Sequence, residues 1–74
     1  MLVKFEIYND GKHWCARGIG EDIFTQGKTL DKLMENIGEA VLAHFDDDVI
    51  EENEIKILSI SETEVGRVAK TASG

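Results

Sequence analysis

Residues 29–45 read Thr-Leu-Asp-Lys-Leu-Met-Glu-Asn-Ile-Gly-Glu-Ala-Val-Leu-Ala-His-Phe, and this stretch predicts one amphipathic helix from Thr29 to about Phe45. Thr29 is a favourable N-cap residue, and Asp31 suits the positive end of the helix dipole. Gly38 is expected to let the helix approach a sheet closely. The apolar positions recur three and four residues apart, which places them on one face of the helix. They are Leu30, Leu33, Met34, Ile37, Val41, Leu42 and Phe45.

The residues before this helix predict three strands. Residues 2–8 alternate apolar and polar side chains, which is typical of a strand with one buried face. The Asn-Asp-Gly step at residues 9–11 predicts a turn, because glycine adopts positive φ without a steric penalty. A second strand is then expected at residues 13–17 and a short third strand at residues 23–26. Residues 18–22, with two glycines, are expected to interrupt the pattern between them.

The residues after the helix predict one more strand. Three aspartates at residues 46–48 are unfavourable at the negative end of the helix dipole, so they are expected to end the helix. Residues 51–54 are expected to form a solvated connection, and residues 55–60, rich in isoleucine, a fourth strand. The predicted fold class is therefore α+β, in the order β-β-β-α-β, with one helix packed on an antiparallel-rich sheet. The domain is expected to span residues 1–61, and residues 62–74 to form a polar tail that is mobile or ordered by a neighbour.

Composition limits the possible partners. Of the 74 residues 15 are acidic and eight basic, which gives a formal net charge of −7, and 42% are hydrophobic, as in a folded chain. The negative charge repels a phosphate backbone, so it argues against unaided nucleic-acid binding and favours a basic partner. No apolar run approaches membrane-spanning length, no signal peptide is visible, and Cys15 is the only cysteine. A lone thiol points to a reducing compartment, so we expect a soluble, cytoplasmic protein without membrane contact.

Candidate metal ligands are few. His13, Cys15 and His44 are the only soft ligands, and their scattered positions lack the paired spacing typical of zinc sites. The helix dipole explains His44 without a ligand role, because it lies in the last predicted turn. The aspartate run at residues 46–48 lacks the glycine and the alternating ligands of a calcium loop. No metal and no cofactor are expected.

Catalytic motifs are also weak. Cys15 lies within a predicted strand and has no base and orienting residue paired with it, which favours a packed thiol over a nucleophile. Gly18 and Gly20 form a Gly-x-Gly step without the third glycine of a dinucleotide-binding loop. We therefore expect no enzymatic activity. The rival from another class is a small metal-dependent hydrolase that uses the aspartate run or His44.

The candidate partner-binding residues are Trp14, Arg17, Asp46, Asp47 and Asp48. The aspartates would attract a basic partner. Trp14 has two readings: it completes the core, or it marks the sheet face that the helix leaves uncovered as a binding surface. RNA binding through the sheet would need more aromatic and basic residues on one face than the sequence offers.

Three short segments carry a resemblance to a known family. They are Trp-Cys-Ala at residues 14–16, Phe-Thr-Gln-Gly-Lys-Thr-Leu at residues 24–30 and Glu-Asn-Ile-Gly-Glu-Ala-Val at residues 35–41. In this order they resemble the N-terminal domain of HicB-like antitoxins, over residues 2–60. The usual Pro-Asp-Leu-Pro-Gly connector of that family is replaced by residues 18–22, and the chain contains no proline.

The resemblance implies a β-β-β-α-β fold akin to a truncated ribonuclease H or a double-stranded-RNA-binding domain. It implies an antitoxin that neutralises a small basic HicA-type ribonuclease toxin by direct binding, with no enzymatic activity of its own. No DNA-binding domain follows the fourth strand, so direct DNA binding is not expected. The alternatives are a free-standing adaptor domain with another protein partner and a small RNA-binding domain.

Self-association is expected from the predicted fold itself. One helix covers only one face of a four-stranded sheet, and a strand edge with unpaired amides and carbonyls stays open. A second copy would cover exposed apolar surface and stabilise this small core. A homodimer, or a dimer of dimers, is therefore the expected assembly.

Overall fold

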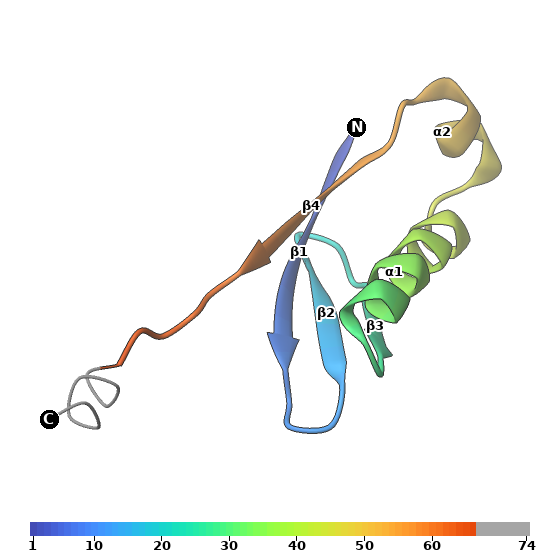
Figure 1. Ribbon diagram of the computed structural model, residues 1–74. Helices are drawn as coiled ribbons and strands as arrows, with labels where there is room; N and C mark the ends of the chain where they lie inside the picture. The colour runs from blue at the N-terminus through green and yellow to red at the C-terminus, as the bar shows by residue number, and fades with distance from the viewer. Residues whose placement is uncertain (67–74) are drawn as a thin grey trace, which may run out of the picture.

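The computed structural model describes residues 1–66, in which four strands form one mixed sheet (Figure 1). The elements in chain order are β1 (Leu2–Asn9), β2 (Trp14–Ile19), β3 (Phe24–Gly27), α1 (Leu30–His44), α2 (Asp47–Glu52) and β4 (Lys56–Ser61). The strand order is β3-β2-β1-β4, with β1 antiparallel to β2, β2 antiparallel to β3, and β1 parallel to β4. The predicted α+β class and its order of elements are confirmed, with the short helix α2 as an addition.

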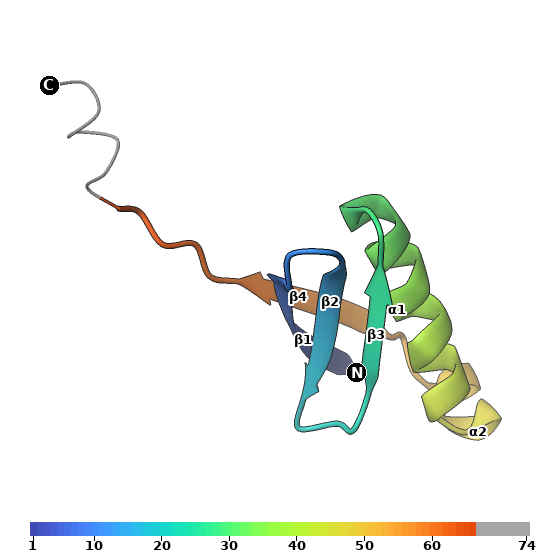
Figure 2. The same cartoon turned by 90° about the horizontal axis from the view of Figure 1, so that it is seen from below.

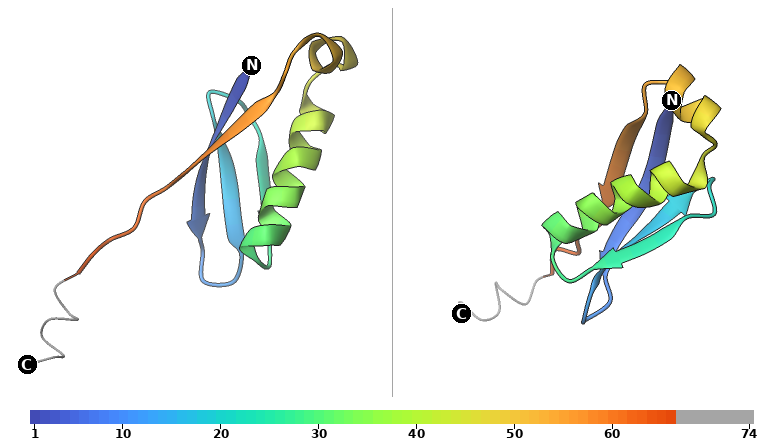
Figure 3. Two further views of the ribbon diagram at one scale, coloured as in Figure 1. Left: turned by 45° about the horizontal axis from the view of Figure 1, so that its top comes forward. Right: turned by 90° about the vertical axis from the view of Figure 1, so that its right-hand side faces the viewer.

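The sheet and α1 form two layers around one core. In Figures 2 and 3, α1 lies on one face of the sheet only. The pairing register places alternate β1 side chains on that face, opposite Ala16 of β2 and Ile57 of β4. The core cluster consists of Val3, Phe5, Ile7, Ala16, Ile23, Leu33, Ile37 and Val41. Val3, Phe5 and Ile7 are all buried on this face, so the period-two pattern of β1 predicted its inner face correctly.

Helix α1 begins and packs as its sequence predicts. The Thr29 hydroxyl accepts a hydrogen bond from the Lys32 N–H at 3.0 Å, as an N-cap should. Leu33, Ile37 and Val41 are its buried residues, which confirms the central part of the predicted apolar face. Of the other predicted members, Leu30, Met34 and Leu42 are exposed by 41% to 56%. The expectation for Gly38 is wrong, because a Cβ placed there would meet nothing within 4 Å.

The aspartate run begins a second helix. Residues 46–48 were expected only to end α1, and residues 51–54 to be a loop, but α2 spans Asp47–Glu52 with Asp46 as its N-cap. The Ile50 N–H donates to the Asp46 carbonyl at 3.1 Å. Carboxylates are unfavourable at the C-terminal end of a helix dipole and favourable at its N-terminal end. The same aspartates therefore disfavour continuation of α1 and favour the start of α2.

The connection between β2 and β3 starts later than predicted. Gly18 and Ile19 belong to β2, where they pair with Phe5 and Lys4. The turn lies at Gly20, whose φ of 84° is in the left-handed region that favours glycine. The Gly18 N–H donates to the Ile23 carbonyl at 2.8 Å and closes the connection. A glycine pair was therefore a poor marker for the end of the strand.

The hairpin between β1 and β2 forms as predicted. The Asn9 side chain accepts a hydrogen bond from the Gly11 N–H at 2.8 Å, and Gly11 has a φ of 101°. The Asp10 N–H donates to the His13 carbonyl at 3.0 Å, so residues 10–13 form the connection. The side-chain bond is an Asx turn, the local structure that the Asn-Asp-Gly step favours.

Beyond β4, residues 62–66 are exposed and outside any helix or strand. The remaining part of the predicted tail, residues 67–74, lies outside the described residues. Within residues 1–66, neither helix has the length and apolar character needed to cross a membrane.

Candidate protein-binding surfaces

The sheet face opposite α1 carries a set of exposed apolar side chains, and we call it the open face. Its residues alternate with the core residues along each strand, as the pairing register shows. The large apolar members, exposed by 38% to 57%, are Leu2, Tyr8, Ile19, Phe24, Leu58 and Ile60. Several large exposed apolar side chains on one face of a sheet are typical of a protein-interaction site.

Charged residues are interspersed on the open face. Lys4, Arg17 and Lys56 are its basic members, and Glu6 is acidic. Arg17 donates to the Glu6 carboxylate across the β1–β2 pair, and its guanidinium lies 5.9 Å from the centre of the Tyr8 ring. The Arg17 and Glu6 side chains are exposed by 64% and 43%, so this ion pair stabilises the fold little and remains accessible to a partner.

Cys15 also belongs to the open face, but it is buried. Its Sγ lies 3.7 Å from Asp10 Oδ2. Burial raises the pKa of the Cys15 thiol, and the adjacent Asp10 carboxylate raises this pKa further. The pKa of Asp10 is lowered, first by the hydrogen bond from the His13 N–H and then by that from the Lys12 N–H. A thiol whose pKa is raised in this way is a poor nucleophile, which agrees with the prediction that Cys15 is a packed thiol.

We expect alkylation of Cys15 by iodoacetamide at neutral pH to be much slower in the native protein than in urea. Unfolding would expose the thiol and separate it from Asp10, so both causes of its raised pKa would be lost. Mass spectrometry of samples quenched over time measures both rates. Equal rates in the two states would show that Cys15 is an accessible, reactive thiol.

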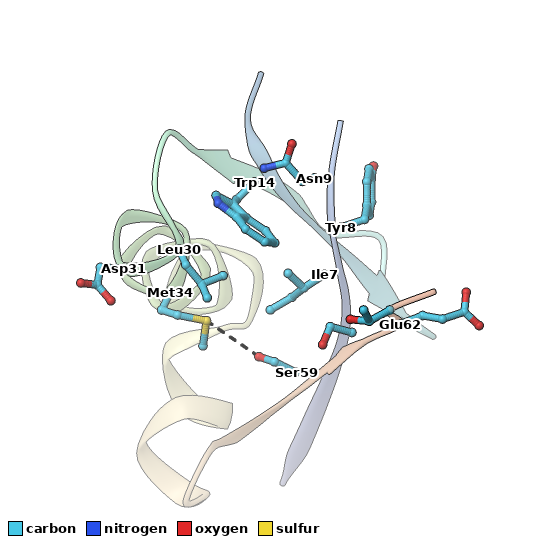
Figure 4. A pocket seen from close by; sticks show the side chains of 11 residues that line it. Ile7, Tyr8, Asn9, Trp14, Leu30, Asp31, Met34, Ser59 and Glu62 are labelled. Atoms are coloured by element: carbon cyan, nitrogen blue, oxygen red, sulfur yellow. Dashed lines mark hydrogen bonds between the residues drawn. The ribbon is translucent and has the colours of Figure 1, made fainter. Parts of the chain in front are cut away.

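A groove of about 610 Å³ lies between the start of α1 and the end of β4. It exists because α1 packs over β2 and β3 and leaves the β4 side of the covered face open. Figure 4 shows Trp14, Leu30 and Met34 along it, with the Ser59 hydroxyl 3.9 Å from the Met34 sulfur. Leu30 and Met34 are both exposed by more than 40%, so α1 contributes an apolar wall that nothing in residues 1–66 covers.

Negative charge is concentrated at the end of the molecule that carries α2. Residues 46–54 contain six acidic residues and no basic one, so the formal charge of this segment is −6. The formal net charge of the whole chain is −7. We call residues 46–54 the acidic end. Asp46, Asp47, Asp48, Glu51 and Glu52 are exposed, and within residues 1–66 none of these five forms an ion pair.

The sixth acidic residue, Glu54, is paired. Its carboxylate lies 3.5 Å from the Lys56 ammonium, with both side chains exposed, and its carbonyl accepts from the N-terminal amine at 2.6 Å. These contacts join the acidic end to the start of β1 and β4. The other five acidic residues, which form no ion pair within residues 1–66, thus lie on α2 and its N-cap residue, next to a segment that is bonded to the sheet.

Comparison with known proteins gives no relative. The chain matches no protein-family model, no curated protein and no solved structure.

The predicted partner-binding residues lie on three different surfaces. Trp14 is partly buried against the core on the helix-covered face, so it does not mark the open face. Arg17 is on the open face, and residues 46–48 begin α2 at the end of the molecule away from the β1–β2 hairpin (Figure 1). The structure does not bring these residues together into one site.

Sequence reasoning missed the apolar part of the open face. Tyr8, Ile19, Phe24 and Leu58 lie at the strand positions where the period-two pattern predicts polar residues. The sequence did contain a signal for this face, because apolar residues occur at positions that point to both faces of the strands. Such a pattern indicates a sheet that is covered on both sides.

The candidate metal ligands do not gather. His44 Nε2 lies 3.5 Å from the Glu21 carboxylate at the end of α1, whereas His13 and Cys15 lie at the start of β2. In the part of the chain that the structure describes, no three side chains of His, Cys, Asp or Glu form a cluster that could hold a metal ion.

Proposed function

We propose that this protein is a protein-binding module that neutralises a small basic ribonuclease of the HicA type by direct binding, in the cytoplasm. The observation that carries the proposal is the acidic end, with five exposed carboxylates that have no ion-pair partner within residues 1–66. The resemblance of residues 2–60 to HicB-like antitoxins supports the same role. The role requires no catalysis and no cofactor.

The two kinds of surface suit two stages of such binding. Charge of one sign concentrated at one end attracts an oppositely charged partner over a distance and orients it, which raises the association rate. A stable complex then needs roughly 800 Å² of buried surface on each partner, more than a six-residue helix offers. The apolar side chains of the open face would supply the additional contact.

Replacing Asp46, Asp47 and Asp48 together with asparagine is expected to slow association with the basic partner roughly tenfold at low ionic strength. The reason is the loss of three of the five unpaired carboxylates, with little change in buried contacts. Stopped-flow fluorescence with the purified partner measures the rate, and the deficit should shrink as salt is added.

The matched control removes the same charge from another surface, through Asp22→Asn, Glu35→Gln and Glu39→Gln. These three side chains are exposed outside the acidic end. We expect this variant to associate nearly as fast as the native protein. If both variants slow association equally, the acidic end has no special part in the encounter.

RNA binding through the open face is a second candidate, because one observation favours it. Tyr8 and Phe24 are exposed there, and the basic residues Lys4, Arg17 and Lys56 lie on the same face. Aromatic side chains on a sheet can stack on the bases of single-stranded RNA. Fluorescence anisotropy with a labelled oligonucleotide separates the candidates. Binding that Phe24→Ala abolishes would favour RNA, and no binding at low salt would favour the protein partner.

A further inference from the structure

Within residues 1–66 the sheet has two edges, and only one of them is left open. At β3, the Asn36 side-chain amide donates to the Gln26 carbonyl at 2.7 Å, and α1 packs along the strand. β3 is also only four residues long. Short length and bonding by a neighbouring element both protect an edge from further pairing. The opposite edge, β4, is six residues long and is the last strand of the sheet.

The free hydrogen-bonding groups of β4 can be assigned from its pairing with β1. The Lys56 N–H donates to the Met1 carbonyl at 2.9 Å, so Lys56 directs its backbone groups toward β1. Backbone groups of successive strand residues point to alternate sides. Ile57, Ser59 and Ser61 therefore direct their N–H and C=O groups away from the sheet, and the strand contains no proline that would remove a donor.

We propose that a second copy of this chain pairs with this edge, β4 against β4, antiparallel about a two-fold axis at Ser59. In this register Ser59 faces Ser59 of the second copy, and Ile57 faces Ser61 of the second copy. Directly opposed residues of this type exchange both backbone hydrogen bonds, so all three outward-facing residues of each strand are satisfied. A two-fold axis closes the assembly, because each copy uses the same edge.

The side chains of the open face select this register. It sets Lys56 opposite Glu62 of the second copy, and Leu58 opposite Ile60 of the second copy, each pair occurring twice. Opposite charges and paired apolar side chains stabilise directly opposed strand positions. A shift by two residues in one direction sets Leu58 opposite Glu62, and a shift in the other direction sets Lys56 opposite Ile60. Of these three registers, only the one centred on Ser59 places an apolar residue opposite each apolar residue and also places Lys56 opposite an acidic residue.

The intramolecular contacts of these residues do not prevent the pairing. Lys56 contacts Glu54 at 3.5 Å, but both side chains are more than 70% exposed, so the Lys56 side chain can turn to a new partner at little cost. Leu58 and Ile60 are exposed by 43% and 44% in the monomer. Pairing would bury part of both and join the two open faces into one continuous surface.

Exchanging the charges tests the register. Lys56→Glu alone and Glu62→Lys alone should each weaken the dimer roughly tenfold, because both opposed pairs become repulsive. An equimolar mixture of the two variants should recover the native affinity, since the mixed dimer contains two attractive pairs. Sedimentation equilibrium measures all three samples. In the control mixture of Lys56→Glu with Glu64→Lys, the Lys56→Glu chain should not regain the native affinity, because Glu64 does not face Lys56 in this register. The Glu64→Lys variant alone should dimerise like the native protein.

Crosslinking gives a readout that does not depend on charge. Cysteines at Ser59 of the two copies would lie about 5.5 Å apart between Cα atoms, within disulfide range, so Ser59→Cys should form a covalent dimer on mild oxidation. Ser61→Cys should not, because its two copies would be four residues apart along the strands. A native protein that stays at 8.2 kDa up to high micromolar concentration would overturn the proposal. Recovery only in the control mixture, or crosslinking only through Ser61→Cys, would overturn the register.

Discussion

Ile37→Ala is expected to lower the free energy of unfolding by roughly 2 to 5 kcal/mol. Ile37 has no exposed surface and lies in the middle of the buried stripe of α1, between Leu33 and Val41. Truncation removes buried methyl groups and leaves a cavity that a small two-layer core cannot readily fill. Folded proteins have a total stability of only roughly 0.05 to 0.15 kcal/mol per residue. A chain of 74 residues would therefore lose a large part of its stability.

Leu42→Ala is the matched control, because Leu42 is on the same helix but 56% exposed. Its effect should stay within about 0.5 kcal/mol. Urea titration followed by circular dichroism gives both values. If Ile37→Ala costs less than half a kcal/mol, or no more than Leu42→Ala, the packing of α1 on the sheet is not as described.

Gly27→Ala is expected to cost roughly 1 to 3 kcal/mol. Gly27 ends β3, and a Cβ placed on it would lie 2.7 Å from the Leu33 nitrogen and 3.0 Å from the Leu33 Cα. Both atoms belong to the main chain of α1, so a side-chain rotation cannot relieve the clash. The first turn of α1 would have to move away from β3, with loss of packing around Leu33. Urea titration again gives the value.

Gly38→Ala tests the same substitution where the structure leaves room. A Cβ at Gly38 meets nothing within 4 Å, and alanine is favoured over glycine inside a helix by roughly 0.5 to 1 kcal/mol. This variant should therefore be more stable than the native protein. Destabilisation by Gly38→Ala, or a neutral effect of Gly27→Ala, would mean that the close approach of helix and sheet occurs at a different glycine.

The sequence predicted the regular part of the fold because burial there follows simple periods. Leu33, Ile37 and Val41 are spaced as one face of a helix, and Val3 and Phe5 as one face of a strand. The short helix α2 could not be predicted in this way. It has no fully buried residue, so no apolar period marks it, and its acidic residues indicated only the end of α1.

The surfaces were harder to predict than the core. The acidic end was visible in the sequence because its charges are contiguous. The open face was not, since its members come from four strands and share a surface only once the register is known. Trp14 shows the same limit: its neighbours in sequence did not decide its face, but its pairing with Asn9 and Gly27 does. Which surface binds a partner depends on such non-local pairing.

Edge pairing and partner binding are compatible in this structure. Dimerisation through β4 would use the backbone groups of Ile57, Ser59 and Ser61, none of which belongs to the acidic end. It would also present two acidic ends and a joined open face to incoming partners, so each dimer could bind two of them.

We expect the reading frame adjacent to the gene of this protein to encode a small basic ribonuclease. RNA cleavage by that ribonuclease, measured with increasing amounts of this protein, is the decisive measurement. We expect cleavage to fall in proportion to the added protein and to reach background at a fixed molar ratio, with the triple asparagine variant acting more slowly at low salt. Cleavage that continues unchanged at several-fold excess, or an adjacent frame that encodes no basic protein, would contradict the proposed function.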